Sequence, residues 1–180
     1  MSGISQEIFD NLITDKTKTD NNVLVILVGL PYSGKSTFAE KLSKHNFVHF
    51  WATKIKKQYQ LNDEEFLKLS KEIIEELLSK NYNIVFDFLN HKNEQRNNFY
   101  SIAEKLHKKV FVVYLDTPKN IILERQASVV EDIGRTNIST DIINEIESEF
   151  EIPISENVFT IKDEIDFDIF LNSIRVQQLK

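Results

Sequence analysis

The sequence predicts an α/β fold in which a five-stranded, mainly parallel β-sheet lies between two layers of helices. Two observations lead to this prediction. Runs of β-branched and aliphatic residues alternate along the chain with segments whose apolar residues recur at helical spacing. Two of these runs, residues 23–28 and 110–115, continue without a charged residue, which is typical of strands that are buried on both faces of a parallel sheet. Regular alternation of strand and helix favours the three-layer α/β/α arrangement.

Each element follows from its local pattern. A polar lead-in, residues 1–22, includes a short helical pattern over 4–12, and the domain itself is expected to span 23–180. Asn62 and Glu65 are spaced as a capping box, so the amphipathic segment that follows them should be a helix. Pro118 suits the first turn of another helix, and residues 128–137 are expected to form a loop. The predicted strands are 23–28, 47–50, 83–88, 110–115 and 158–161, and the predicted helices are 36–44, 62–80, 94–107, 118–125, 141–150 and 166–179.

Composition restricts the class of protein. The chain has 180 residues, of which 41% are hydrophobic, so it can form the core of one globular domain. The 22 basic and 28 acidic residues give a net charge of −6, which does not favour nucleic acid or an anionic membrane as partner. The absence of cysteine excludes disulfides, thiolate nucleophiles and cysteine-ligated metals. With no apolar export signal near the first residue and no apolar run of membrane-spanning length, we expect a cytoplasmic protein without a membrane contact.

A phosphate-binding motif follows the first predicted strand directly. The residues Gly29 to Ser36 satisfy G-x-x-x-x-G-K-[ST], and a helix is predicted to begin at their end. Two glycines let the backbone curl around phosphate oxygens, and the first turn of the helix offers unpaired N–H groups to an anion. Lys35 is expected to reach the β- and γ-phosphates, and the Ser36 hydroxyl to coordinate Mg²⁺. The predicted ATP- and Mg²⁺-binding loop comprises Gly29, Leu30, Pro31, Tyr32, Ser33, Gly34, Lys35, Ser36 and Thr37.

Further motifs follow this loop in a characteristic order. They are Asp87-Phe88-Leu89-Asn90, Arg96, Leu115-Asp116-Thr117-Pro118, Glu124-Arg125 and Glu151-Ile152-Pro153. In this order the chain, from Val23 to its end, resembles the compact P-loop kinases, a group that includes polynucleotide 5′-kinases, zeta-toxin-like kinases and small predicted kinases with an AAA domain. The resemblance implies a P-loop NTPase fold and phosphotransferase activity.

The resemblance also implies roles for two arginines. In such kinases a lid closes over the nucleotide, and its arginines neutralise the charge that develops on the transferred phosphoryl group. Arg125 and Arg135 match this role in a lid near residues 125–138. For Arg125 a surface ion pair or a helical i,i+4 contact is the alternative interpretation.

A carboxylate is predicted at the ligand-binding edge of the sheet. Asp87 ends a buried strand, where open α/β folds place their ligands, so it can hold a Mg²⁺-bound water, orient a lid arginine or act as general base. The alternative is that Asp87 or Asn90 caps the next helix. Asp116 ends another strand and is expected to cap the helix that follows.

The chain departs from the family after its second predicted strand. Relatives carry an aspartate there that takes the proton from the accepting hydroxyl, but residues 47–57 contain no carboxylate. Asp87 or His49 could replace it, although a packing or capping role is favoured for His49. The same segment contributes to a basic, aromatic patch that could hold an anionic or base-containing acceptor by charge and stacking, or else form a solvated helix face with Trp51 in the core. We define this basic–aromatic patch as Trp51, Lys54, Lys56, Lys57 and Tyr59.

These observations predict an ATP- and Mg²⁺-dependent kinase for a hydroxyl group of a small molecule or nucleotide. Lys35, Asp87, Arg125 and Arg135 are the predicted catalytic residues, and Ser36 and Asp87 the predicted metal ligands. Two alternatives stay open: a nucleotide-binding switch or weak NTPase that acts through a protein partner, and a polynucleotide 5′-kinase. The acceptor, the preference for ATP over GTP and the oligomeric state do not follow from the sequence.

Overall fold

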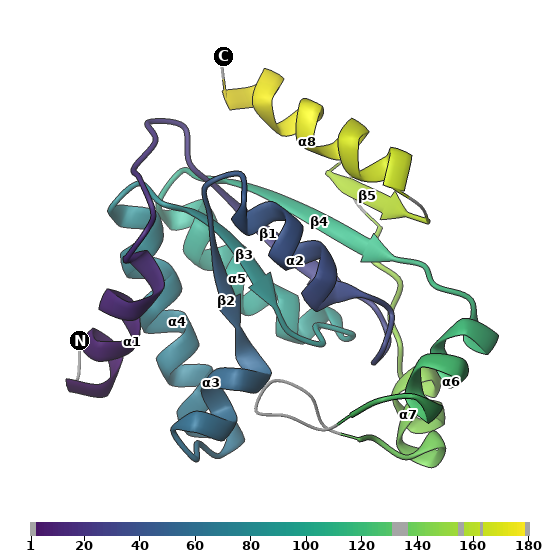
Figure 1. Cartoon of the computed structure of the whole chain (residues 1–180). Helices are drawn as coiled ribbons and strands as arrows, with labels where there is room; N and C mark the ends of the chain where they lie inside the picture. Colours follow the sequence, from purple (N-terminus) through teal and green to yellow (C-terminus); the bar gives the residue numbers. More distant parts are fainter. Residues whose placement is uncertain (1–2, 131–136, 155–156, 163, 179–180) are drawn as a thin grey trace.

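The computed structural model describes residues 3–130, 137–154, 157–162 and 164–178. It contains a five-stranded sheet of order β2-β3-β1-β4-β5 in which every pairing is parallel (Figure 1). The predicted α/β class and five-stranded sheet are therefore confirmed. The strands are β1 (Val23–Val28), β2 (Phe47–Trp51), β3 (Asn83–Asp87), β4 (Lys109–Leu115) and β5 (Val158–Ile161), and the helices are α1 (Gly3–Ile13), α2 (Lys35–Ser43), α3 (Ala52–Gln58), α4 (Asp63–Ser79), α5 (Asn93–Lys105), α6 (Lys119–Ala127), α7 (Thr140–Ser148) and α8 (Glu164–Gln178).

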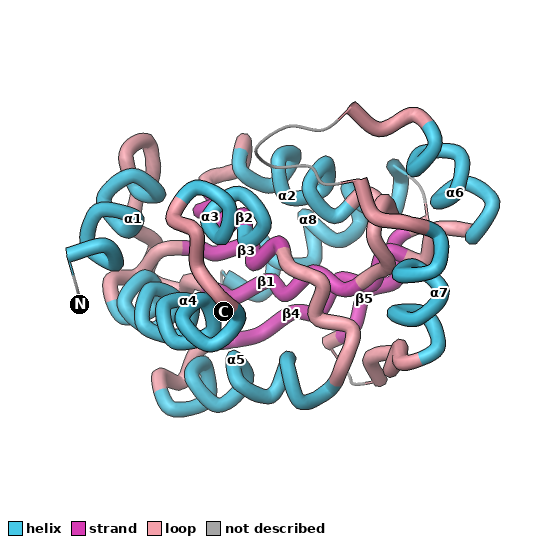
Figure 2. The backbone as a smooth tube through the Cα atoms, turned by 90° about the horizontal axis from the view of Figure 1, so that it is seen from below, coloured by secondary structure: helices cyan, strands magenta, loops and turns pink. Residues whose placement is uncertain are grey.

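Helices cover both faces of the sheet because the central strand is apolar on both sides. In β1, Leu24 and Ile26 pack into one hydrophobic cluster with α1, α4 and α5, whereas Val25 and Leu27 pack into a second cluster with α2 and α8. All six residues of β1 are buried. Figure 2 shows the two helical layers on either side of the strands. The three layers thus bury a strand with no polar face.

The strand order indicates where a ligand should bind, at the carboxyl ends of the strands. Strand β1 lies between β3 and β4, and the connection that leaves β1 crosses to the far edge, at β2. Ligands of open α/β sheets bind at such points, where successive connections run to opposite sides of the sheet. The loop after β1 therefore occupies the expected ligand position.

Helix α4 agrees with its sequence pattern. Asn62 accepts a hydrogen bond from the Glu65 N–H, the Glu65 carboxylate accepts from the Asn62 N–H, and the capping box is complete. Helix α1 lies within the polar lead-in, and its Ile8 and Phe9 are buried in the core. None of the described helices is both long enough and apolar enough to cross a membrane.

Two local expectations differ from the structure. Helix α3 was not predicted, because its seven residues are too few to show a clear apolar period. Helix α6 begins after Pro118, which takes the N-cap position with an extended ψ of 142°, and Asp116 does not cap it. Asp116 instead accepts a hydrogen bond from the Tyr114 hydroxyl at 3.2 Å.

Candidate nucleotide-binding site

The loop between β1 and α2 makes a tight turn that its glycines permit. A Cβ atom on Gly29 would lie 2.5 Å from Ser33 Oγ and 3.1 Å from the Leu115 carbonyl oxygen, so a side chain there would collide with the loop. Gly34 has a φ of +100° and Tyr32 a φ of +63°. A tyrosine in the left-handed region costs conformational energy of about 1 to 3 kcal/mol, and such strain concentrates at functional sites.

The loop delivers the N-terminus of α2 to a large cavity. Helix α2 has nine residues and no side-chain cap at its N-terminus, so its first N–H groups face the loop. The cavity has a volume of about 830 Å³ and is lined by residues 31–37, by Asp87, and by Arg125 and Thr117. Gly29 and Leu30, the other two residues of the predicted loop, do not line this cavity, but their carbonyl oxygens accept hydrogen bonds from Lys35. An N-terminal helix turn at a cavity of this size suits a polyphosphate.

Lys35 is enclosed by the backbone of its own loop. Its Nζ donates hydrogen bonds to the carbonyl oxygens of Gly29 and Leu30, both at 2.8 Å. Burial lowers the pKa of Lys35 to about 8, and the nearby Asp87 carboxylate opposes this shift by favouring the charged amine. The ammonium group is thus held at the cavity, where an anionic ligand would neutralise its charge.

The pKa of Lys35 predicts a pH dependence of nucleotide binding. Phosphate groups favour the charged amine, so binding should raise this pKa and take up a proton when the solution pH lies above about 8. We expect the affinity for MgATP to be nearly constant below pH 7 and to fall by about tenfold between pH 7 and pH 9. Isothermal titration calorimetry in buffers of different ionisation enthalpy measures both effects. Lys35→Met should bind weakly and without proton uptake, and equal proton uptake by this variant would contradict the assignment to Lys35.

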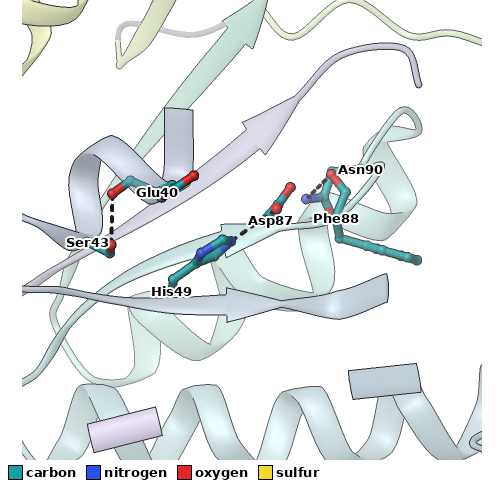
Figure 3. Close-up of polar contacts among 6 residues, drawn as sticks. All are labelled: Glu40, Ser43, His49, Asp87, Phe88 and Asn90. Atoms are coloured by element: carbon teal, nitrogen blue, oxygen red, sulfur yellow. Dashed lines mark hydrogen bonds and ion pairs between the residues drawn. The ribbon is translucent and has the colours of Figure 1, made fainter. Parts of the chain in front are cut away.

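Asp87 lies at the same cavity and is paired with a histidine. Its carboxylate Oδ2 is 3.1 Å from His49 Nε2 on the neighbouring strand. Figure 3 marks this contact with a dashed line. Neither Asp87 nor Asn90 caps α5, whose N-cap is Lys92, so the capping alternative is wrong. Asn90 instead donates from Nδ2 to the carbonyl oxygen of Leu27, at 3.0 Å, and ties the β3 loop to the end of β1.

The described part of the predicted lid contacts the phosphate-binding loop directly. Arg125, which is exposed, donates from Nη1 to the Tyr32 carbonyl oxygen at 3.0 Å, and the Tyr32 hydroxyl accepts from the Ile138 N–H at 2.7 Å. Thr117 Oγ1 donates to the Ser33 carbonyl oxygen at 2.8 Å. Arg125 therefore contacts the backbone of the loop. Arg135, the other predicted lid arginine, lies outside the described residues.

The basic–aromatic patch is occupied by contacts within the protein. Lys56 forms an ion pair with an aspartate of α4, and the Tyr59 hydroxyl donates to Glu7 of α1 at 2.9 Å. Trp51 is half-buried at the end of β2, and Lys54 Nζ lies 5.8 Å from the centre of its ring. The patch thus joins α1, α3 and α4, and Trp51 is not a core residue.

The donor set fits Mg²⁺ together with a nucleotide. Ser36 and Asp87 both line the cavity, which is the combination of a hydroxyl and a carboxylate that usually accompanies phosphate oxygens and water around this ion. Within the described ranges, no group of three acidic or histidine side chains forms a cage for a metal. Ser36 and Asp87 would hold the ion together with phosphate oxygens of the nucleotide.

Comparison with known proteins agrees with this geometry. A family model described as an AAA domain matches residues 24–153. The chain belongs to this family. The matched region begins in β1 and ends after α7, so it contains the loop, Asp87 and Arg125.

Named proteins resemble this AAA domain over most of its length. The L-seryl-tRNA(Sec) kinase of Methanococcus maripaludis is 26% identical over 84% of the chain and 64% of its own length. The bifunctional polynucleotide phosphatase/kinase of Schizosaccharomyces pombe is 24% identical over 83% of the chain and 35% of its own length. The chain thus spans less than two thirds of either relative. The crystal structure of Chaetomium thermophilum Kti12 in complex with ADP-AlF3 shares the fold, with a TM-score of 0.64 and 15% identity over 85% of this chain and 97% of that one.

Two contacts of the AAA domain were missed by the sequence-based prediction. His49 was favoured as a packing residue, and Thr117 was read as part of a helix start. Side chains alternate between the two faces of a strand, so His49 and Trp51 lie on the face opposite Val48 and Phe50. This alternation could have predicted that His49 lies on the α2 side of the sheet. Its proximity to Asp87 depends on the pairing of β2 with β3, which no local pattern reveals.

Proposed function

We propose that this protein is a P-loop kinase that transfers the γ-phosphoryl group of ATP to a hydroxyl group. The observation that carries the proposal is the joint position of Lys35 and Asp87 at one cavity, a cation for phosphate and a carboxylate for a proton or a metal-bound water. The kinase domain is assigned to residues 23–180, with the lid near 125–138.

Each residue has a distinct part in the proposed reaction. The backbone N–H groups of the loop and the Lys35 ammonium would bind the phosphates. Ser36 would hold Mg²⁺ directly, and Asp87 would contact the ion only through a coordinated water. When bound, the ion neutralises charge on the β- and γ-phosphates. The acceptor oxygen forms a bond to the γ-phosphorus as the bond to ADP breaks, and the hydroxyl proton passes to the Asp87 carboxylate. Arg125 and Arg135 are proposed to stabilise the charge on the transferred group.

The names of the two curated relatives suggest which acceptors to test first. One relative is a kinase of a seryl-tRNA and the other a polynucleotide kinase, so an aminoacyl-tRNA hydroxyl and a nucleic acid 5′-hydroxyl lead the list. The net charge of −6 favours a small acceptor, because nucleic acid binding depends on neutralising phosphates. Small-molecule and nucleic acid acceptors should therefore be compared in one assay.

The experiment follows the label of γ-³²P-ATP with Mg²⁺, for wild type and Lys35→Ala. Pooled nucleosides, sugars, amino alcohols, seryl-tRNA and 5′-hydroxyl oligonucleotides serve as acceptors. Label on one acceptor class, dependent on Lys35, supports the kinase. Lys35-dependent release as inorganic phosphate alone would contradict it and favour a switch or weak NTPase. Label on an oligonucleotide that falls steeply with salt would identify a polynucleotide kinase.

A further inference from the structure

His49 occupies a boundary between two cavities. It belongs to β2, an edge strand, and its Nε2 atom is 3.1 Å from Asp87 Oδ2. The Asp87 side chain is only 3% exposed, whereas the His49 side chain is 17% exposed. Asp87 lines the cavity of about 830 Å³ at the phosphate-binding loop, which we call the phosphate cavity. A second cavity of about 240 Å³ is lined by His49, Trp51 and Tyr59, together with Ile8 and Leu12 of α1.

The orientation of the His49 ring is determined by its neighbours. The ring stacks on Trp51 with centroids 5.4 Å apart and an angle of 8° between the planes. The hydrogen bond of the ring to Asp87 is made by its Nε2 atom. A carboxylate accepts hydrogen bonds, so its partner nitrogen must carry a proton. The Asp87 carboxylate therefore favours the Nε2–H tautomer of His49.

We propose that His49 is a positioning residue for Asp87. Its Nε2–H donates to Asp87 Oδ2 and thereby orients the buried carboxylate, so that the other oxygen, Oδ1, is directed at the acceptor hydroxyl. In the transfer step Oδ1 takes the hydroxyl proton, and the proton on His49 Nε2 stays in place. This inference rests on the proposed kinase function. It supplies an orienting partner on β2, the strand that pairs with the Asp87-bearing strand β3.

Chemical rescue tests this role. His49→Ala should retain its affinity for MgATP and lose about 30-fold in kcat, because a misplaced carboxylate transfers protons poorly. The second cavity opens on to the vacated position, so added imidazole should restore much of kcat by donating an N–H to Asp87. Thiazole has a similar ring but no N–H, and it should not restore activity. The matched control, His45→Ala, removes an exposed histidine before β2 and should leave kcat unchanged.

Several outcomes would overturn the inference. Unchanged kcat in His49→Ala, or equal rescue by imidazole and thiazole, would show that His49 only fills space. If His49→Ala melts too early for assay, His49→Gln and His49→Leu carry the comparison, and similar activity in both would contradict the need for an N–H donor.

A measurement without turnover separates this inference from the kinase proposal. Nitrogen-15 NMR of the histidine side chains should show the Nε2–H tautomer for His49, with a signal that moves in Asp87→Asn. A signal of the Nδ1–H tautomer would overturn the pairing even in an active kinase. Failure of wild type to label any acceptor would instead overturn the kinase proposal, and the positioning role for proton transfer with it.

Discussion

Replacement of Lys35 by alanine is expected to abolish phosphoryl transfer, with a loss of about 10³-fold or more in kcat/KM. The variant removes the one side chain of the loop that brings a positive charge to the phosphates, and charge stabilisation supplies most of the catalysis of phosphoryl transfer. Because Lys35 Nζ donates hydrogen bonds to the carbonyl oxygens of Gly29 and Leu30, its removal should also disturb the shape of the loop.

Thermal melting provides a second measurement on Lys35→Ala. At a MgATP concentration of 100 times the dissociation constant, the wild-type protein should gain about 2.7 kcal/mol of stability, and the variant should gain almost none. Lys44→Ala, at the other end of α2, is the control and should melt and bind as wild type does. An unchanged MgATP shift in Lys35→Ala would refute the assigned phosphate site.

The second large effect is expected for Asp87→Asn, which should lower kcat by about 10² to 10³-fold. The amide cannot take the acceptor's proton and is a poor partner for a Mg²⁺-bound water, yet it has nearly the same volume in a buried position. MgATP affinity should change by less than about fivefold if Asp87 acts mainly on the proton. A large loss of MgATP affinity would assign Asp87 to the metal instead.

Asp116→Asn is the matched control for this substitution. Asp116 also follows a strand at the same edge of the sheet, but its contacts are the Tyr114 hydroxyl and, at 3.9 Å, Lys162. It does not line the phosphate cavity. Single-turnover assays of both variants should therefore separate a catalytic carboxylate from a carboxylate that only shares its position in the fold. Equal losses in the two variants would argue for a general electrostatic effect.

Local patterns were sufficient to predict the strands and the phosphate-binding loop. The phosphate-binding motif could be predicted because its parts follow one another directly in the chain. These parts are β1, the glycines at 29 and 34, and the start of α2. The capping box of α4 is local in the same way, and it was predicted correctly. Helix α3 was missed because it is short, and tertiary packing of Ala52 and Ile55 stabilises it more than its own propensity does.

The contacts that join distant segments could not be predicted. The pairing of His49 with Asp87 requires β2 and β3 to be neighbours, and the contact of Arg125 with Tyr32 requires α6 to return to the loop. Each of these contacts depends on which elements bury their apolar faces against one another. That is a property of the whole core, and no short segment of the sequence reveals it.

The sequence alone thus determined the α/β class, the motif for phosphate and the residues Lys35 and Ser36, because these depend on periodicity and on residues close together in the chain. The tertiary structure decided that Asp87 faces the phosphate cavity and does not cap α5, and that it is paired with His49. It also decided that Thr117 and Arg125 bind the loop. The physical reason is that strand order and helix packing minimise exposed apolar surface over the whole domain, and only that global arrangement brings these side chains within hydrogen-bonding distance.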